Sequence, residues 1–133
     1  MSILFRCLVA GSRGIVDYEI VEKKLDHMLK NKYINGETIE IVTGLAKGPD
    51  LSGLRYAKEH NLNVAGFKAQ WDLFGKGAGH IRNRDMAEYL SKDKDNAGAV
   101  VFWDGVSPGS KGMIKLLNDY GIKHIVVIVK EEF

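Results

Sequence analysis

Residues 97–113 read AGAVVFWDGVSPGSKGM and contain three kinds of sequence in succession. Residues 97–103 are almost continuously apolar, which indicates a strand buried on both faces of a sheet. A loop rich in glycine follows, and the apolar residues Ile114, Leu116 and Leu117 then mark one face of a helix. A buried strand, a glycine-rich loop and a helix in this order form the repeating unit of a parallel α/β sheet.

Related patterns occur along the rest of the chain. Residues 3–10 and 123–129 are also nearly continuous apolar runs, which predict strands buried on both faces, and residues 38–43 and 63–67 predict two further strands. Apolar residues between these strands recur at helical spacing. The expected stripes are Val21, Leu25, Met28 and Leu29, then Leu51, Leu54 and Ala57, and then Met86, Ala87 and Leu90.

Helix boundaries are marked by residues that favour caps and stops. Asp17 can cap the first helix, Asn35 and Gly36 can end it, and Gly121 can end the last one. Strands and helices therefore alternate from one end of the chain to the other. This order predicts an α/β fold of the doubly wound type, a mostly parallel five-strand sheet with helices on both faces.

Length and composition are those of one ordinary globular domain spanning residues 1–133. No apolar run approaches the roughly 20 residues needed to span a membrane, and the N-terminus has no signal-peptide pattern. The single cysteine, Cys7, cannot form an internal disulfide. We therefore expect a cytoplasmic protein. The formal net charge of +2 is too small to argue for nucleic acid.

Ten of the fifteen glycines lie in the four loops that follow the first four strands. In an open parallel sheet these loops share one edge, and ligands bind at that edge. Glycine lets backbone N–H groups approach a ligand closely, and helix N-termini favour anions. One such loop would be explained by turn conformation alone, but four at one edge favour an anion-binding site.

Each loop supplies candidate ligand-binding residues. Ser12 and Arg13 can hold a phosphate or carboxylate, although Arg13 could equally pair with a neighbouring acid. Asp50 stands where a helix begins, so one carboxylate oxygen would cap the helix while the other accepts from a ribose hydroxyl. Trp71 can stack on a base, and Arg82 is expected at the surface, in contact with the ligand. The candidates are Gly11, Ser12, Arg13, Gly44, Gly48, Asp50, Trp71, Lys76, Arg82, Asn83, Asp104, Gly109, Ser110, Lys111, Gly112 and Met113.

Several familiar motifs are incomplete. Arg13 and Val16 stand where the dinucleotide fingerprint G-x-G-x-x-G requires glycine, and the loop after residue 103 lacks the Walker spacing. That loop matches the nucleophile elbow G-x-S-x-G, but Pro108 follows the serine and has no N–H for an oxyanion hole. The histidines are scattered and form no metal-ligand pattern. Neither a metal nor another cofactor is expected.

The loop sequences together resemble the SLOG superfamily, and within it the group that carries the domain of unknown function called DUF2493. The matching blocks are Gly11-Ser12-Arg13, residues 44–50, Trp71 with residues 75–86, and residues 104–113. The resemblance implies a Rossmann-like sheet with a site for a nucleotide or nucleotide-derived signal. Relatives include DNA-processing proteins, cytokinin-activating phosphoribohydrolases and sensor domains of antiphage systems.

The chain departs from the phosphoribohydrolase motif P-G-G-x-G-T-x-x-E. Ser110 replaces the second glycine, Met113 the threonine and Leu116 the catalytic glutamate. Without that acid, the resemblance favours a binding protein with no catalytic residue, either a sensor or a sponge that sequesters a signalling nucleotide, as a phage could encode. A nucleotide hydrolase of the N-glycosidic type that uses Asp50 or Asp104 is the alternative, and a nucleic-acid binder is a weaker third.

The expected partners are a nucleotide-derived small molecule and further copies of the same chain. Small domains of this resemblance often pair, and Met86, Ala87 and Leu90 would place an apolar stripe close to the site. Neither a membrane nor a nucleic acid is an expected partner.

Overall fold

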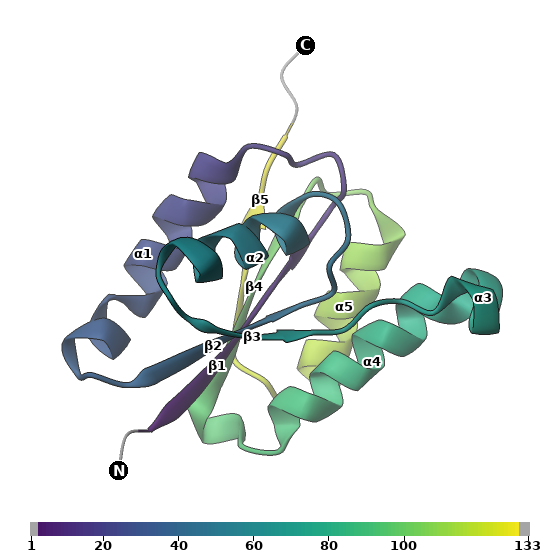
Figure 1. Ribbon diagram of the computed structural model, residues 1–133. Helices are drawn as coiled ribbons and strands as arrows, with labels where there is room; N and C mark the ends of the chain where they lie inside the picture. Colours follow the sequence, from purple (N-terminus) through teal and green to yellow (C-terminus); the bar gives the residue numbers. More distant parts are fainter. Residues whose placement is uncertain (1–2, 131–133) are drawn as a thin grey trace.

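The computed structural model describes residues 3–130, which form an open sheet with helices on both faces (Figure 1). The strand order is β3-β2-β1-β4-β5, and every neighbouring pair is parallel. The predicted α/β, doubly wound arrangement is therefore confirmed. The elements are β1 (Leu4–Gly11), α1 (Tyr18–Ile34), β2 (Thr38–Thr43), α2 (Pro49–Glu59), β3 (Asn63–Gly66), α3 (Trp71–Phe74), η1 (Gly75–Gly77), α4 (Ala78–Ser91), η2 (Lys94–Asn96), β4 (Ala97–Trp103), α5 (Pro108–Asp119) and β5 (His124–Ile128).

The two central strands, β1 and β4, are buried on both faces, as their apolar sequences predict. Leu8 shows the arrangement: it lies opposite Val42 of β2 on one side and Ala99 of β4 on the other. The same prediction is wrong for β5. This strand pairs only with β4 at the edge of the sheet, and Ile125 and Ile128 are 42% and 50% exposed.

Helices α1 and α2 cover one face of the sheet, and α4 and α5 cover the other (Figure 1). The stripe expected on α2 is partly wrong, because Leu51 is 44% exposed whereas Gly53 and Tyr56 face the core. Gly53 explains the difference: a Cβ at this position would lie 2.8 Å from Cβ of Val9. The missing side chain lets α2 approach β1 closely along this face.

The helix boundaries follow the predicted signals. Asp17 caps α1 by accepting a hydrogen bond of 3.0 Å from the backbone N–H of Glu19. The helix ends at Asn35 and Gly36, and α5 ends before Gly121. Gly36 and Gly121 have φ of 68° and 69°, the left-handed conformation that glycine adopts at helix ends.

The apolar stripe of α4 lies inside the molecule. Met86, Ala87 and Leu90 are buried in the cluster that α4 and α5 form against the sheet. They cannot pack against another copy of the chain, so this argument for a homo-oligomer is wrong. Among residues 3–130, no helix combines the length and apolar character required to cross a membrane.

Candidate functional site

The loops at the carboxyl ends of the strands surround a cavity of about 570 Å³. This volume is within the usual range of small-molecule sites, roughly 300–1,000 Å³. The walls are the loops after β1 and β2, the starts of α2, α4 and α5, and residues of α3 and η1. The candidates from the sequence that line the cavity are Gly11, Ser12, Arg13, Asp50, Trp71, Lys76, Arg82, Asn83, Gly109, Ser110, Gly112 and Met113.

Four of the candidates do not line this cavity: Gly44, Gly48, Asp104 and Lys111. The two glycines allow the loops to pack together behind it. A Cβ on Gly44 would lie 2.6 Å from Nη1 of Arg82, and a Cβ on Gly48 would lie 2.9 Å from the carbonyl oxygen of Ser12. Gly48 also has φ of 98°, which strains any other residue.

Asp50 is a carboxylate that lines the cavity although its side chain is almost completely buried, with 4% exposure. Its Oδ2 accepts a hydrogen bond of 3.4 Å from the backbone N–H of Ala46. Burial raises the pKa of Asp50 to about 6, while the charge of Arg82 and the N–H groups of Ala46 and Gly11 oppose this shift. The site therefore contains one carboxyl group that titrates just below neutral pH.

The expectation that Asp50 caps α2 is wrong. Gly48 is the cap residue and Pro49 takes the first helical position, where its missing N–H costs nothing. Asp50 is therefore one position further along, where its side chain turns toward the β2 loop and the N–H of Ala46. Its own carbonyl oxygen accepts a hydrogen bond of 2.7 Å from the hydroxyl of Thr43, which ties the start of α2 to the end of β2.

Arg82 is half-buried, so the expectation that it lies at the surface is wrong. Its Nη1 donates to the carbonyl oxygen of Gly44 at 2.7 Å, and its Nε donates to Oδ1 of Asn83 at 2.9 Å. Burial lowers the pKa of Arg82, while the charge of Asp50 opposes this shift. Arg84, about 200° further around the helix, is exposed. Arg82 therefore links α4 to the β2 loop while it lines the cavity.

Two buried serines join the β1 loop to α5. The hydroxyl oxygens of Ser12 and Ser110 lie 3.1 Å apart, and Oγ of Ser12 also accepts from the backbone N–H of Asp104 at 3.1 Å. Ser110 is the residue that replaces a glycine of the phosphoribohydrolase motif. Its hydroxyl therefore fixes the distance between two walls of the cavity.

The start of α5 presents backbone to the cavity. Pro108 is the first helical residue, and the cap residue Ser107 makes no side-chain hydrogen bond to the helix. A Cβ on Gly109 or Gly112 would meet nothing within 4 Å. The first turn of a helix carries unpaired N–H groups and a partial positive charge, so this wall of the cavity favours an anion.

Asp104 shapes the loop before α5. Its Oδ1 accepts from the backbone N–H groups of Val106 and Ser107 at 2.9 and 2.8 Å, and its Oδ2 accepts from the hydroxyl of Ser107 at 2.6 Å. These bonds to the charged form lower the pKa of Asp104 to about 2. Both oxygens of this carboxylate therefore accept hydrogen bonds from residues of its own loop.

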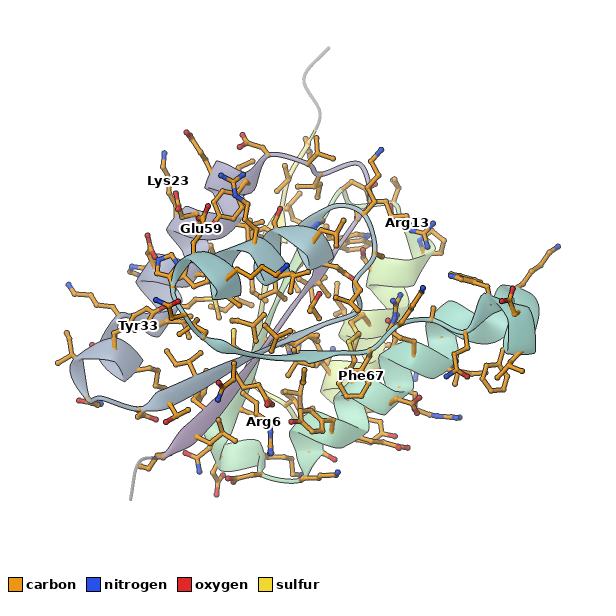
Figure 2. The ribbon with its side chains drawn as sticks, in the orientation of Figure 1. Arg6, Arg13, Lys23, Tyr33, Glu59 and Phe67 are labelled. Carbon is orange, nitrogen blue, oxygen red and sulfur yellow. The ribbon has the colours of Figure 1, made fainter. Side chains whose placement is uncertain are left out.

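Cations and an aromatic ring line the outer part of the cavity. Arg13 and Lys76 are exposed, and Trp71 is 47% exposed with the Arg13 guanidinium 5.9 Å from its ring centroid. Arg13 lies at the end of the molecule where the loops gather, opposite Arg6 (Figure 2). None of the ion pairs within residues 3–130 involves Arg13 or Lys76.

Sequence reasoning missed several lining residues, among them His80. It lies in the first turn of α4, two residues before Arg82, within a segment already notable for its cations, and this position could have indicated it. Leu116 is buried among the core residues of α4 and α5, so no acid stands there. In the part of the chain from residue 3 to 130, no three metal-binding side chains are grouped to hold an ion. The other missed lining residues are Ala10, Gly14, Ala46, Gly79, Ser107 and Pro108.

Comparison with known proteins gives a family and a fold. The structure is similar to that of DNA processing protein A (DprA) from Streptococcus pneumoniae, with a TM-score of 0.53 and 18% sequence identity. The match covers 94% of this chain but only 59% of that one, and at this identity it supports the fold alone. No curated protein matches the sequence. The model of the YspA, cpYpsA-related SLOG family matches residues 5–74, more than half of the chain, and the protein therefore belongs to this family.

Proposed function

We propose that the protein binds a nucleotide or nucleotide-derived anion in the cavity and acts as a sensor or a sequestering protein, without turning the ligand over. The observation that carries the proposal is the composition of the cavity walls. Arg13 and Lys76 lack acidic partners among residues 3–130, and they line the same cavity as the first turn of α5. Cations and helix N-termini together attract phosphate groups.

The other walls suit the remaining parts of a nucleotide. Trp71 offers a half-exposed ring on which a base can stack. The guanidinium of Arg82 has five N–H donors and uses two groups, Nη1 and Nε, within the protein. Its remaining donors are available to a ribose or phosphate oxygen.

The absence of turnover is inferred from Leu116. The resemblance assigns catalysis to a glutamate at this position, and the leucine is packed in the core between α4 and α5. The lining of the cavity includes one carboxylate, Asp50.

Asp50 supports a second candidate function, hydrolysis of an N-glycosidic bond. It lines the cavity, and its pKa of about 6 is close to the value that a general acid or base needs near neutral pH. If this function is correct, the Asp50→Asn variant binds the ligand but releases neither free base nor ribose phosphate.

The proposed binding can be tested by mass spectrometry of the small molecules released from purified protein. We expect a nucleotide-class compound from the natural protein and a strong loss of it from Gly109→Leu, because the new side chain would extend into the cavity from a position with free space. Gly77→Leu is the matched control. Gly77 also has free space around a Cβ, but it does not line the cavity.

Incubation of the recovered compound with fresh protein separates the two functions. Intact compound after prolonged incubation supports a binding protein. Release of free base that is abolished in Asp50→Asn supports hydrolysis instead. Equal amounts of the compound from the natural protein and Gly109→Leu would contradict binding in this cavity.

A further inference from the structure

A second pocket of about 240 Å³ adjoins the cavity on the side of the β2 loop. Arg13, Ala46, Trp71 and Arg82 line both spaces. The rest of the second pocket is formed by the β2 loop and by the segment between β3 and α3. Those residues are Gly44, Leu45, Lys47, Lys68 and Ala69.

Every charged residue that lines the second pocket is a cation: Arg13, Lys47, Lys68 and Arg82. None of them takes part in the ion pairs found between residues 3 and 130. The charge of Arg13 contributes to the lowered pKa of Arg82, while the charge of Asp50 opposes it, so at least these two cations of the pocket repel each other. A group of cations of this kind is stabilised when an anion binds among them.

The second pocket is too small for a whole nucleotide. Its volume is below the roughly 300–1,000 Å³ of typical small-molecule sites, so it suits one phosphate group of a larger ligand. The larger cavity has a separate region for an anion at the start of α5, and no residue of α5 lines the second pocket. In the sheet, β1 lies between β2 and β4, so the β1 loop separates the two regions.

We propose that the ligand carries two phosphate groups at separate positions, one at the start of α5 and the other in the second pocket. The base and ribose lie between them, beside Trp71, and Arg13 lies between the two phosphates because it lines both spaces. The ligand class is a nucleoside bisphosphate, in preference to a nucleoside monophosphate. This inference rests on the proposed function and specifies the ligand of the same site.

The test is calorimetric titration with three sets of probes: the 5′-monophosphates, 5′-diphosphates and 3′,5′-bisphosphates of the four common ribonucleosides. For the preferred base, we expect the bisphosphate to bind at least about tenfold more tightly than the monophosphate. The double variant Lys47→Ser/Lys68→Ser should lose this advantage and retain the affinity for the monophosphate, because both lysines line the second pocket only.

The matched control is Lys23→Ser/Lys30→Ser, which removes the same charge from exposed positions on α1. Lys23 lies far from Arg13 (Figure 2). This control should keep the preference for the bisphosphate, and if it loses the preference as well, the effect is one of net charge and the proposal is wrong.

The remaining outcomes separate the ligand class from the binding itself. Equal affinities for monophosphate and bisphosphate would overturn the second phosphate site and leave the proposed function intact. A diphosphate that binds as tightly as the bisphosphate would contradict separate positions. A short single-stranded oligonucleotide that binds more tightly than every mononucleotide would replace the proposal with nucleic-acid binding, and no binding of any probe would overturn the proposed function as well.

Discussion

The segments that follow β2 and β4 each provide an aspartate at the same edge of the sheet, Asp50 in the first turn of α2 and Asp104 in the loop before α5. The pKa values of the two carboxylates are shifted in opposite directions. Asp50, after β2, is buried at the cavity with a pKa raised to about 6. Asp104, after β4, accepts three hydrogen bonds within its own loop, and its pKa is lowered to about 2.

The difference indicates what each loop contributes to the site. In the loop after β4, Asp104 fixes the path of the chain before α5. This segment therefore contributes backbone groups to the cavity, at the start of that helix. The segment after β2 places Asp50, in the first turn of α2, in the cavity wall, where desolvation opposes the charged form of the carboxyl group. A buried carboxyl that destabilises the fold at neutral pH is typical of a functional position.

The largest predicted effect comes from Gly11, which lies between the two loops. A Cβ at this position would lie 2.3 Å from the carbonyl oxygen of Phe102, at the end of β4, and 2.6 Å from Cγ of Pro49, at the start of α2. We expect Gly11→Ala to lower the free energy of unfolding by about 3 kcal/mol, because backbone atoms must move to accept the methyl group. Urea denaturation measures the change.

Gly112→Ala is the control for this substitution. Gly112 is inside α5 and has free space around a Cβ, so alanine should stabilise the protein by up to about 1 kcal/mol through its helix propensity. Equal stability of Gly11→Ala and the natural protein would show that the β2 and β4 loops are not held together at this point.

The sequence predicts the sheet well because its signals are local. Continuous apolar runs identify β1 and β4 as central strands, and glycines after four strands place the loops at one edge. The errors concern contacts between distant segments. The spacing of Leu51 predicts a core residue, but the close approach of α2 to β1 at Gly53 places another face of the helix against the sheet. The edge strand β5 has the same apolar composition as a buried strand, so its sequence does not reveal its exposure.

The sequence indicates which residues to consider for the cavity, but it does not predict their burial or their hydrogen-bond partners. Arg82 looks like an ordinary helical surface residue, and its burial depends on the carbonyl oxygen of Gly44, which is 38 positions away. Asp50 lies inside α2 because Gly48 takes the cap position and Pro49 the first helical position. Such three-dimensional contacts leave no periodic signal in the sequence.

The second prediction uses pH to compare the two aspartates, beginning with Asp50. Its folded-state pKa of about 6 is above the ordinary value of 3.8, so the native state binds more protons than the unfolded state between these values. Stability should therefore fall as pH rises through this window, by about 2 kcal/mol from about pH 4.5 to about pH 7.

Asp50→Asn should remove this component, because asparagine does not ionise and its side-chain oxygen can still accept from the N–H of Ala46. The measurement is the free energy of unfolding of both proteins at several pH values. The variant should gain stability relative to the natural protein as pH rises. A constant difference would show that Asp50 ionises normally.

Asp104 should show the opposite sign and a smaller effect. Its folded-state pKa is below the ordinary value, so its stabilising contribution is complete above about pH 5 and is lost as pH falls toward 2. The stability difference between the natural protein and Asp104→Asn should shrink between about pH 5 and about pH 3, as measured by urea midpoints. The effect is smaller than that of Asp50 because solvent reaches Asp104 more readily and screens its carboxylate. A difference that grows as pH falls would contradict the role of the charged form.

The smallest predicted effect concerns Lys111, and it separates the backbone of the β4 loop from its side chains. Lys111 is exposed in the first turn of α5, and it does not line the cavity, whereas Lys76 does. The side chain of Lys111 is solvated outside the cavity, and water and salt weaken the interaction of such a charge with a ligand inside it. Lys111→Ser should therefore change the dissociation constant of the recovered ligand by less than about twofold, while Lys76→Ser should raise it about fivefold or more.

The free energy of unfolding of Lys111→Ser should be unchanged or higher by a few tenths of a kcal/mol, because a cation is unfavourable at a helix N-terminus. Calorimetric titration of the two variants side by side decides the comparison. If Lys111→Ser weakens binding as much as Lys76→Ser, the segment after β4 contributes charge to the site as well as backbone. The conclusion that it contributes backbone alone would then be wrong.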